Sequence, residues 1–127
     1  MVVTRSKKYR AHQHAKRIIL IRHGESEGNR NVDIYATVPD HAIGLTDRGR
    51  EQARQCGQKL RQLMGDDETC TFYVSPFHRS KETCEYISKA FPEEKIRKIR
   101  EDPRIREQEW FASRFTCDHL VVDLVVL

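Results

Sequence analysis

The stretch Arg17-Ile-Ile-Leu-Ile-Arg-His-Gly24 joins a short apolar run to three residues with distinct chemistry. Residues 18–21 are all isoleucine or leucine, and the run is bounded by Arg17 and by Gly24. A short apolar run of this kind is typical of a strand buried in a parallel sheet. The sequence therefore predicts a buried strand over residues 17–21 that presents Arg22, His23 and Gly24 just after its carboxyl end.

Two further strands and two amphipathic helices are predicted to follow in alternation. Residues 70–74 are rich in residues that favour β structure, and residues 96–99 form a weaker third strand. Pro39, Asp40 and Gly44 indicate a loop over residues 30–45. Strands that alternate with helices predict an α/β fold with three layers, α/β/α, around a mostly parallel sheet.

Each helix is predicted from its caps and from an apolar stripe. The first begins after the N-cap Thr46 and closes at Gly65. The second is capped by Ser75, with Pro76 at its first position, and ends before Pro92. The stripe of the first helix is Ala53, Cys56, Leu60, Leu63 and Met64, and that of the second is Phe77, Ser80, Cys84, Ile87 and Phe91.

Polar groups follow all three predicted strands, and parallel sheets bind ligands beyond the carboxyl ends of their strands. Arg22 and His23 follow the first strand, and Ser75 and Arg79 follow the second. The segment Arg104-Ile-Arg106-Glu107 follows the third. Right-handed crossovers would bring these groups to one edge of the sheet. The pattern predicts a single polar site at that edge.

The residue types in this site suit phosphoryl transfer. The guanidinium forks of Arg22 and Arg79 match phosphate oxygens, and Gly24 lets the backbone approach a phosphoryl group. A neutral His23 could accept that group, and Glu107 could protonate the leaving alkoxide. A structural role for His23, a surface charge at Arg79 and a solvated carboxylate at Glu107 remain open alternatives.

Composition places further bounds on the chain. A length of 127 residues fits one domain, and no apolar run approaches the roughly 18 residues of a membrane span. Residues 1–17 hold six basic residues and no acid, so residues 1–16 are predicted to be a basic flexible tail, with an organellar transit peptide as an open alternative. The unpaired spacing of the four cysteines favours reduced thiols in an intracellular, cytoplasmic protein.

Four ordered motifs resemble the histidine phosphatase superfamily, whose fold is phosphoglycerate-mutase-like. They are Arg22-His-Gly-Glu-Ser-Glu-Gly-Asn29, Leu45-Thr-Asp-Arg-Gly-Arg-Glu-Gln-Ala53, Ser75-Pro-Phe-His-Arg-Ser-Lys-Glu-Thr83 and Asp102-Pro-Arg-Ile-Arg-Glu107. The resemblance implies that His23 is the phosphoryl acceptor and that Glu107 is the proton donor and acceptor. It implies that Arg22, Asn29 and Arg79 bind the phosphate, with no metal and no cofactor. The loop over residues 35–44 looks more like that of plant and protist phosphoglycerate-mutase-like proteins than that of the glycolytic mutases.

The resemblance covers about residues 16–110 and stops near Phe111. Residues 17–110 are therefore predicted to be the N-terminal part of a phosphoglycerate-mutase-like domain, and residues 111–127 a tail foreign to the family. Family domains are longer and carry a second catalytic histidine late in the chain. His119 lacks the flanking pattern of that histidine, so we expect a truncated, incomplete fold with impaired turnover. Residues 121–127 have the composition of a strand that could pair with an open sheet edge.

Three functions follow from these observations. The first is a phosphomonoesterase-like enzyme that acts on a small phosphorylated substrate through phospho-His23. The second is a remnant that binds a phosphorylated ligand without turnover. The third, nucleic-acid contact through the basic start, is not expected, and no membrane association is predicted. Substrate identity and oligomeric state are not given by the sequence.

Overall fold

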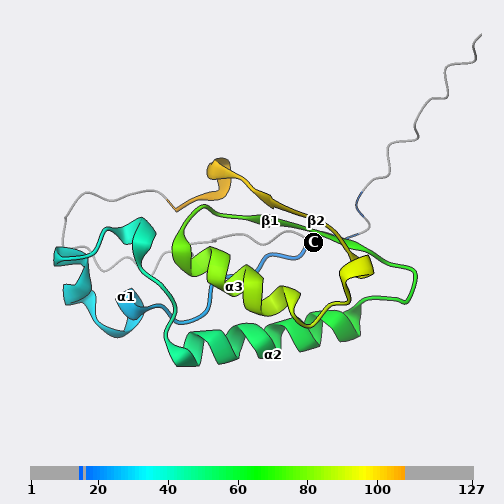
Figure 1. The fold of residues 1–127 in the computed structure, drawn as a ribbon, viewed down its shortest axis with the longest axis horizontal. Helices are drawn as coiled ribbons and strands as arrows, with labels where there is room; N and C mark the ends of the chain where they lie inside the picture. Colours follow the sequence, from blue (N-terminus) through cyan, green and yellow to red (C-terminus); the bar gives the residue numbers. More distant parts are fainter. Residues whose placement is uncertain (1–14, 16, 108–127) are drawn as a thin grey trace, which may run out of the picture.

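The computed structural model describes Ala15 and residues 17–107, and Figure 1 shows the arrangement of its elements. The predicted tail over residues 111–127 lies outside the described residues, and so does the strand predicted near its end. Residues 1–14 and 16 of the predicted basic tail also lie outside them. In chain order the elements are α1 (Glu27–Arg30), η1 (Val32–Ala36), η2 (Asp40–Ala42), α2 (Asp47–Leu63), β1 (Cys70–Val74), α3 (His78–Ser88), η3 (Glu93–Lys95), β2 (Ile96–Glu101) and η4 (Pro103–Ile105).

The sheet of the described residues is the parallel pair β1 and β2, with Phe72 opposite Ile99. This confirms the predicted α/β class and the strand over residues 70–74, and it extends the third strand to Glu101. Helix α3 packs on both α2 and β1, and in Figure 1 it lies between the strands and α2. The crossover from β1 through α3 to β2 places the ends of both strands at one edge, as parallel pairing requires.

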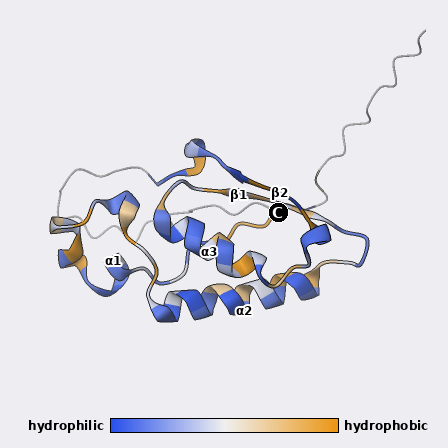
Figure 2. Ribbon diagram, viewed as in Figure 1, coloured by the Kyte–Doolittle hydropathy of each residue, from blue (hydrophilic) through white to orange (hydrophobic). Residues whose placement is uncertain are grey.

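The core lies where these three elements meet. It contains Phe72 and Val74 from β1, Ala53 and Leu60 from α2, and Cys84, Ile87 and Phe91 from α3 and the residues after it. The rings of Phe72 and Phe91 meet edge to face with centroids 5.7 Å apart. Figure 2 shows that most of α2 is hydrophilic, with a few apolar positions, so the helix is stabilised by one apolar face.

The buried strand predicted over residues 17–21 is wrong, because the structure assigns these residues to no strand. Ile19 and Ile21 pack against the core, whereas Ile18 is 68% and Leu20 is 59% exposed. This alternation is that of an extended chain with one buried face. Composition favoured an extended conformation there, but a strand also needs backbone pairing with a second strand, and among residues 17–107 the structure pairs this segment with none.

The helix boundaries are partly as predicted. Thr46 is the N-cap of α2, and its Oγ1 accepts a hydrogen bond from the Gly49 amide at 3.0 Å. Helix α3 begins at His78, two residues later than predicted, with Phe77 as the N-cap and the Ser75 hydroxyl accepting from the Phe77 amide. The apolar stripe predicted for α3 is buried throughout. Leu63, which was predicted to lie on the apolar stripe of α2, is instead exposed.

No helix within the described part of the chain is long and apolar enough to cross a membrane.

Candidate functional site

The segment that contains His23 is bound to the protein by four successive backbone amides. We call residues 22–27 the site loop. The amides of residues 24–27 donate, in chain order, to Thr83 Oγ1, Gln52 Oε1, Asn29 Oδ1 and the Gly44 carbonyl oxygen, at 2.9–3.1 Å. Because these donors already have acceptors inside the protein, an anion at the site loop would be bound by side chains.

Two glycines let the site loop contact the first turn of α2 directly. A Cβ on Gly24 would lie 2.3 Å from the Gly49 carbonyl oxygen, and a Cβ on Gly49 would lie 2.1 Å from the Glu25 carbonyl oxygen. Neither approach is compatible with a side chain. The close backbone approach that Gly24 permits in this structure is to α2.

The ring of His23 is oriented by its own chain. Its Nδ1 lies 2.6 Å from the Gly24 carbonyl oxygen. A carbonyl oxygen can only accept a hydrogen bond, so Nδ1 carries the proton in the neutral ring. The lone pair of that tautomer is then on Nε2, which is the form in which an imidazole acts as a nucleophile.

A pocket of about 360 Å³ lies beside His23 and is lined by Arg22, His23, Glu25, Asn29 and Gln52. Arg22 is exposed there. The Oδ1 atom of Asn29 accepts hydrogen bonds from the amide and the hydroxyl of Ser26, each at 3.0 Å. Those bonds leave Nδ2, a donor, as the polar atom of the Asn29 amide that can serve a ligand. Three of the five predicted site residues thus line one pocket.

The other two, Arg79 and Glu107, form an ion-pair cluster with Asp40. The Arg79 side chain is only 3% exposed, so its interpretation as a surface charge is wrong. Its Nη1 donates to the Asp40 carboxylate at 2.7 Å and to the Asp40 carbonyl oxygen at 3.0 Å. Its Nη2 donates to the Glu107 carboxylate at 2.6 Å, and the guanidinium stacks over the Phe77 ring.

Tyr35, from the loop that carries Asp40, lies close to the same cluster. Desolvation by burial raises the pKa of its phenol, the Asp40 carboxylate raises it further, and the Arg79 guanidinium opposes both effects. The Tyr35 hydroxyl also occupies the space that a Cβ on Gly28 would need. The loop over residues 31–44 is thereby folded back over α1 and onto the buried arginine.

Thr83 connects the pocket to the ion-pair cluster. Its hydroxyl accepts from the Gly24 amide at 3.1 Å and donates to the Arg79 carbonyl oxygen at 2.8 Å. Sequence reasoning missed Thr83, although its position four residues after Arg79 is a spacing at which a helical threonine bonds back to the backbone. It also missed Gln52 and Asp40, and for Asp40 the sequence carries no local signal.

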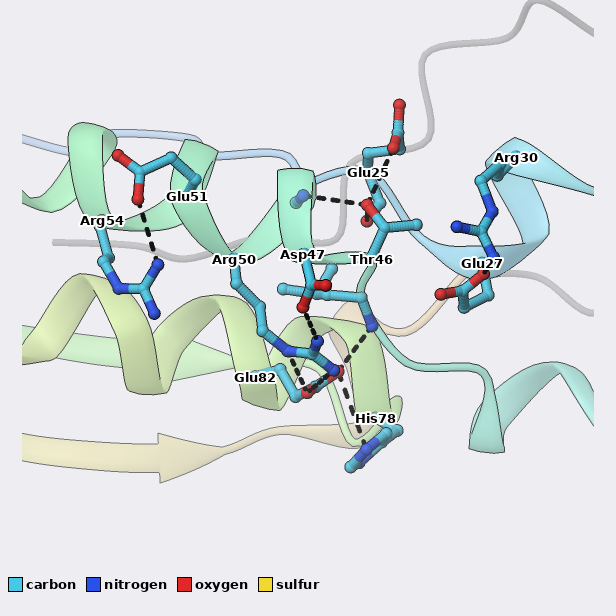
Figure 3. A network of polar contacts seen from close by, with 12 residues as sticks. Glu25, Glu27, Arg30, Thr46, Asp47, Arg50, Glu51, Arg54, His78 and Glu82 are labelled. Atoms are coloured by element: carbon cyan, nitrogen blue, oxygen red, sulfur yellow. Dashed lines mark hydrogen bonds and ion pairs between the residues drawn. The ribbon is translucent and has the colours of Figure 1, made fainter.

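Glu82 fixes the segment between the loop and α2, as Figure 3 shows. Its carboxylate accepts from the Leu45 amide at 2.6 Å and pairs with the guanidinium of Arg50 at 3.2 Å. One step further, the Thr46 hydroxyl donates to the Glu25 carboxylate at 2.8 Å. Polar contacts therefore link α3, α2 and the site loop.

Of the predicted polar group after the third strand, Glu107 alone is found in the cluster with Arg79. Arg104 instead forms a pair with Asp102, at 2.6 Å between Nη2 and Oδ2. The hydrogen bonds from Arg104 lower the pKa of Asp102 to about 2. Among residues 15 and 17–107, no group of three or more histidine, cysteine or acidic side chains is arranged to bind a metal ion.

Comparison with known proteins identifies relatives of the chain and of its fold. Residues 18–113 match the histidine phosphatase superfamily (branch 1). The phosphoglycerate mutase-like protein AT74H of Arabidopsis thaliana is 46% identical over 103 residues, which are 75% of this chain and 37% of that protein. The broad-range acid phosphatase DET1 of Saccharomyces cerevisiae is 47% identical over 51 residues, 40% of this chain and 15% of that protein.

A solved structure supports the fold. A candidate phosphohistidine phosphatase, SixA, from Nakamurella multipartitia has a TM-score of 0.50 at 21% identity, over 68% of this chain and 41% of that one. The chain spans about a third of the length of AT74H and of a second phosphoglycerate mutase-like protein of Arabidopsis thaliana, AT74.

Proposed function

The chain belongs to the histidine phosphatase superfamily, and from that premise we propose that it transfers phosphoryl groups from small phosphomonoesters through a phosphohistidine at His23. The observation that carries the proposal is the hydrogen bond between Nδ1 and the Gly24 carbonyl oxygen. It places the lone pair of the neutral ring on Nε2, beside a pocket that also contains Arg22 and Asn29.

In the proposed reaction Nε2 attacks phosphorus, the N–P bond forms and the ester P–O bond breaks. Glu107 gives its proton to the departing alkoxide oxygen, and it later takes a proton from the water that hydrolyses the phosphohistidine. Arg22, Asn29 and Arg79 would bind the phosphoryl oxygens. The contact between Glu107 and Arg79 supports this division, because it keeps the proton carrier beside a phosphate-binding guanidinium.

A second candidate is a phosphorylated-ligand binder without turnover. Arg22 and Asn29 line the pocket beside His23, so they could bind the phosphoryl oxygens of a ligand whether or not His23 accepts the group.

The two candidates are separated by trapping the covalent step. The protein is incubated with a ³²P-labelled phosphomonoester, quenched in alkali, and tested for protein-bound phosphate that acid releases. Label is expected on the wild type and lost in His23→Ala. His41→Ala, which replaces an exposed histidine outside the site loop, serves as the matched control and should label normally. Label that survives His23→Ala would refute the nucleophile, and phosphate binding without label would favour the second candidate.

A further inference from the structure

Arg79 is paired with two carboxylates, which is more negative charge than one guanidinium neutralises. One guanidinium cation faces the carboxylates of Asp40 and Glu107, so the three side chains together carry one negative charge when both acids are ionised. A phosphate dianion that approached Arg79 would meet two carboxylates. Protonated Glu107, which the proposed reaction requires as the acid, removes one of these charges, but Asp40 has no such role.

Asp40 also occupies the hydrogen-bonding positions that a phosphate would use. Both of its contacts, through Oδ1 and through the carbonyl oxygen, are made to Nη1 of Arg79. Carboxylate and phosphate are recognised by guanidinium in the same planar geometry. The Asp40 side chain is 29% exposed, whereas that of Arg79 is 3% exposed, so the acid is on the solvent side of the pair.

The element that carries Asp40 is short and lies against α3. Asp40 begins η2, a turn of three residues with no side-chain cap. Leu45, in contrast, is buried after that turn and bonded to Glu82. Rotation of the partly exposed Asp40 side chain would withdraw its carboxylate from Arg79 while the packing of η2 on α3 stays in place.

We propose that Asp40 is an internal competitor for the phosphate site: its carboxylate orients Arg79 in the empty protein and is displaced by the phosphoryl group of the substrate. This inference rests on the proposed function, because it takes Arg79 to be a phosphate ligand. It assigns Asp40 as a positioning residue that sets selectivity, since a ligand must offer Arg79 more than the Asp40 carboxylate does. Ligands with a single negative charge should therefore bind more weakly than a phosphate dianion.

The test is the dissociation constant of inorganic phosphate, measured by calorimetry at fixed pH and ionic strength. Asp40→Asn removes the competing charge and should bind phosphate about tenfold more tightly than the wild type, which corresponds to 1.4 kcal/mol. Asp33→Asn makes the same charge change in the exposed part of the same loop and should leave the constant unchanged. Asp40→Glu keeps the carboxylate and should resemble the wild type.

Three results would overturn the inference. The first is weaker or equal phosphate binding by Asp40→Asn when the wild type binds, which leaves the proposed function standing. The second is an equal gain in Asp33→Asn, which would indicate general electrostatics. The third is an Asp40→Asn protein that does not fold, because a pair that is essential for folding cannot be released to a ligand. If no variant and no wild-type protein binds phosphate, the proposed function itself fails.

Discussion

The segment over residues 17–21 and strand β1 have similar compositions and different structures. Both are five residues long and rich in apolar or β-favouring side chains. Strand β1 is paired with β2 and buries Cys70, Phe72 and Val74, whereas the earlier segment buries one side and exposes Ile18 and Leu20. Composition thus selects an extended chain, but pairing depends on partners that are distant in the sequence. The comparison predicts different costs for similar substitutions in the two regions.

The largest effect is expected at the centre of β1. Phe72→Ala removes a fully buried ring that contacts Phe91, and we expect a loss of about 3–5 kcal/mol in the free energy of unfolding. Ile99→Ala, at the half-exposed position opposite in the register, should cost less than about 1 kcal/mol. Urea denaturation followed by circular dichroism measures both. Equal losses would show that β1 does not form the centre of the core.

The next effect concerns the site loop, which follows residues 17–21 and packs against the first turn of α2. Gly49→Ala forces a methyl group against the Glu25 carbonyl oxygen, and overpacking of this kind costs about 1–3 kcal/mol. The same measurement applied to Gly65→Ala is the control, because a Cβ there meets only the Glu68 side chain at ordinary contact distance. A Gly49→Ala protein as stable as the control would mean that the site loop is not packed against α2.

A smaller effect separates the two faces of residues 17–21. Ile21→Ala removes a side chain packed against the core and should cost about 1–2 kcal/mol, while Leu20→Ala, mostly exposed, should stay within about 0.5 kcal/mol. The neighbouring positions make the pair a matched test by thermal denaturation. A larger loss of stability in Leu20→Ala than in Ile21→Ala would mean that the segment buries the opposite face.

The smallest effect is a pH dependence at the end of β2. Since the folded pKa of Asp102 is about 2 and the ordinary value is 3.8, the unfolded chain binds this proton first as pH falls. The pairing with Arg104 therefore stabilises the fold above about pH 4, and this contribution is lost as the pH falls toward 2. Melting temperatures of Arg104→Ala and wild type should differ slightly at pH 5 and converge near pH 2. Arg106→Ala is the control, and a difference that persists at pH 2 would contradict the assignment.

Local patterns predicted the elements well where a single segment contains the whole signal. The buried stripe of α3 follows from its helical spacing, and the N-cap at Thr46 follows from residue type. The strand over residues 17–21 was wrong because its sequence contains no information about a partner. Leu63 was wrong because it lies on the exposed side of the last turn of α2, whereas the adjacent Met64 packs against the core.

The candidate site was predictable to a similar degree. Arg22, His23 and Asn29 belong to one local motif, and the structure places them around one pocket. Arg79 and Glu107 came from separate strand ends, and the fold brings them into contact. The contact between Asp40 and Arg79 joins residues 39 positions apart through an irregular loop, so neither periodicity nor turn chemistry could predict it.

The four hydrogen-bonded amides of the site loop have a consequence for motion. They connect successive residues to four different partners in α3, α2, α1 and the loop before α2. Release of any one residue strains the other three bonds, so these amides should exchange with deuterium together and slowly, in one cooperative opening. The backbone around His23 is then held in place, and any adjustment to an arriving ligand belongs to residues 31–42, ahead of the buried Ile43 and of Gly44, whose carbonyl oxygen accepts from the Glu27 amide.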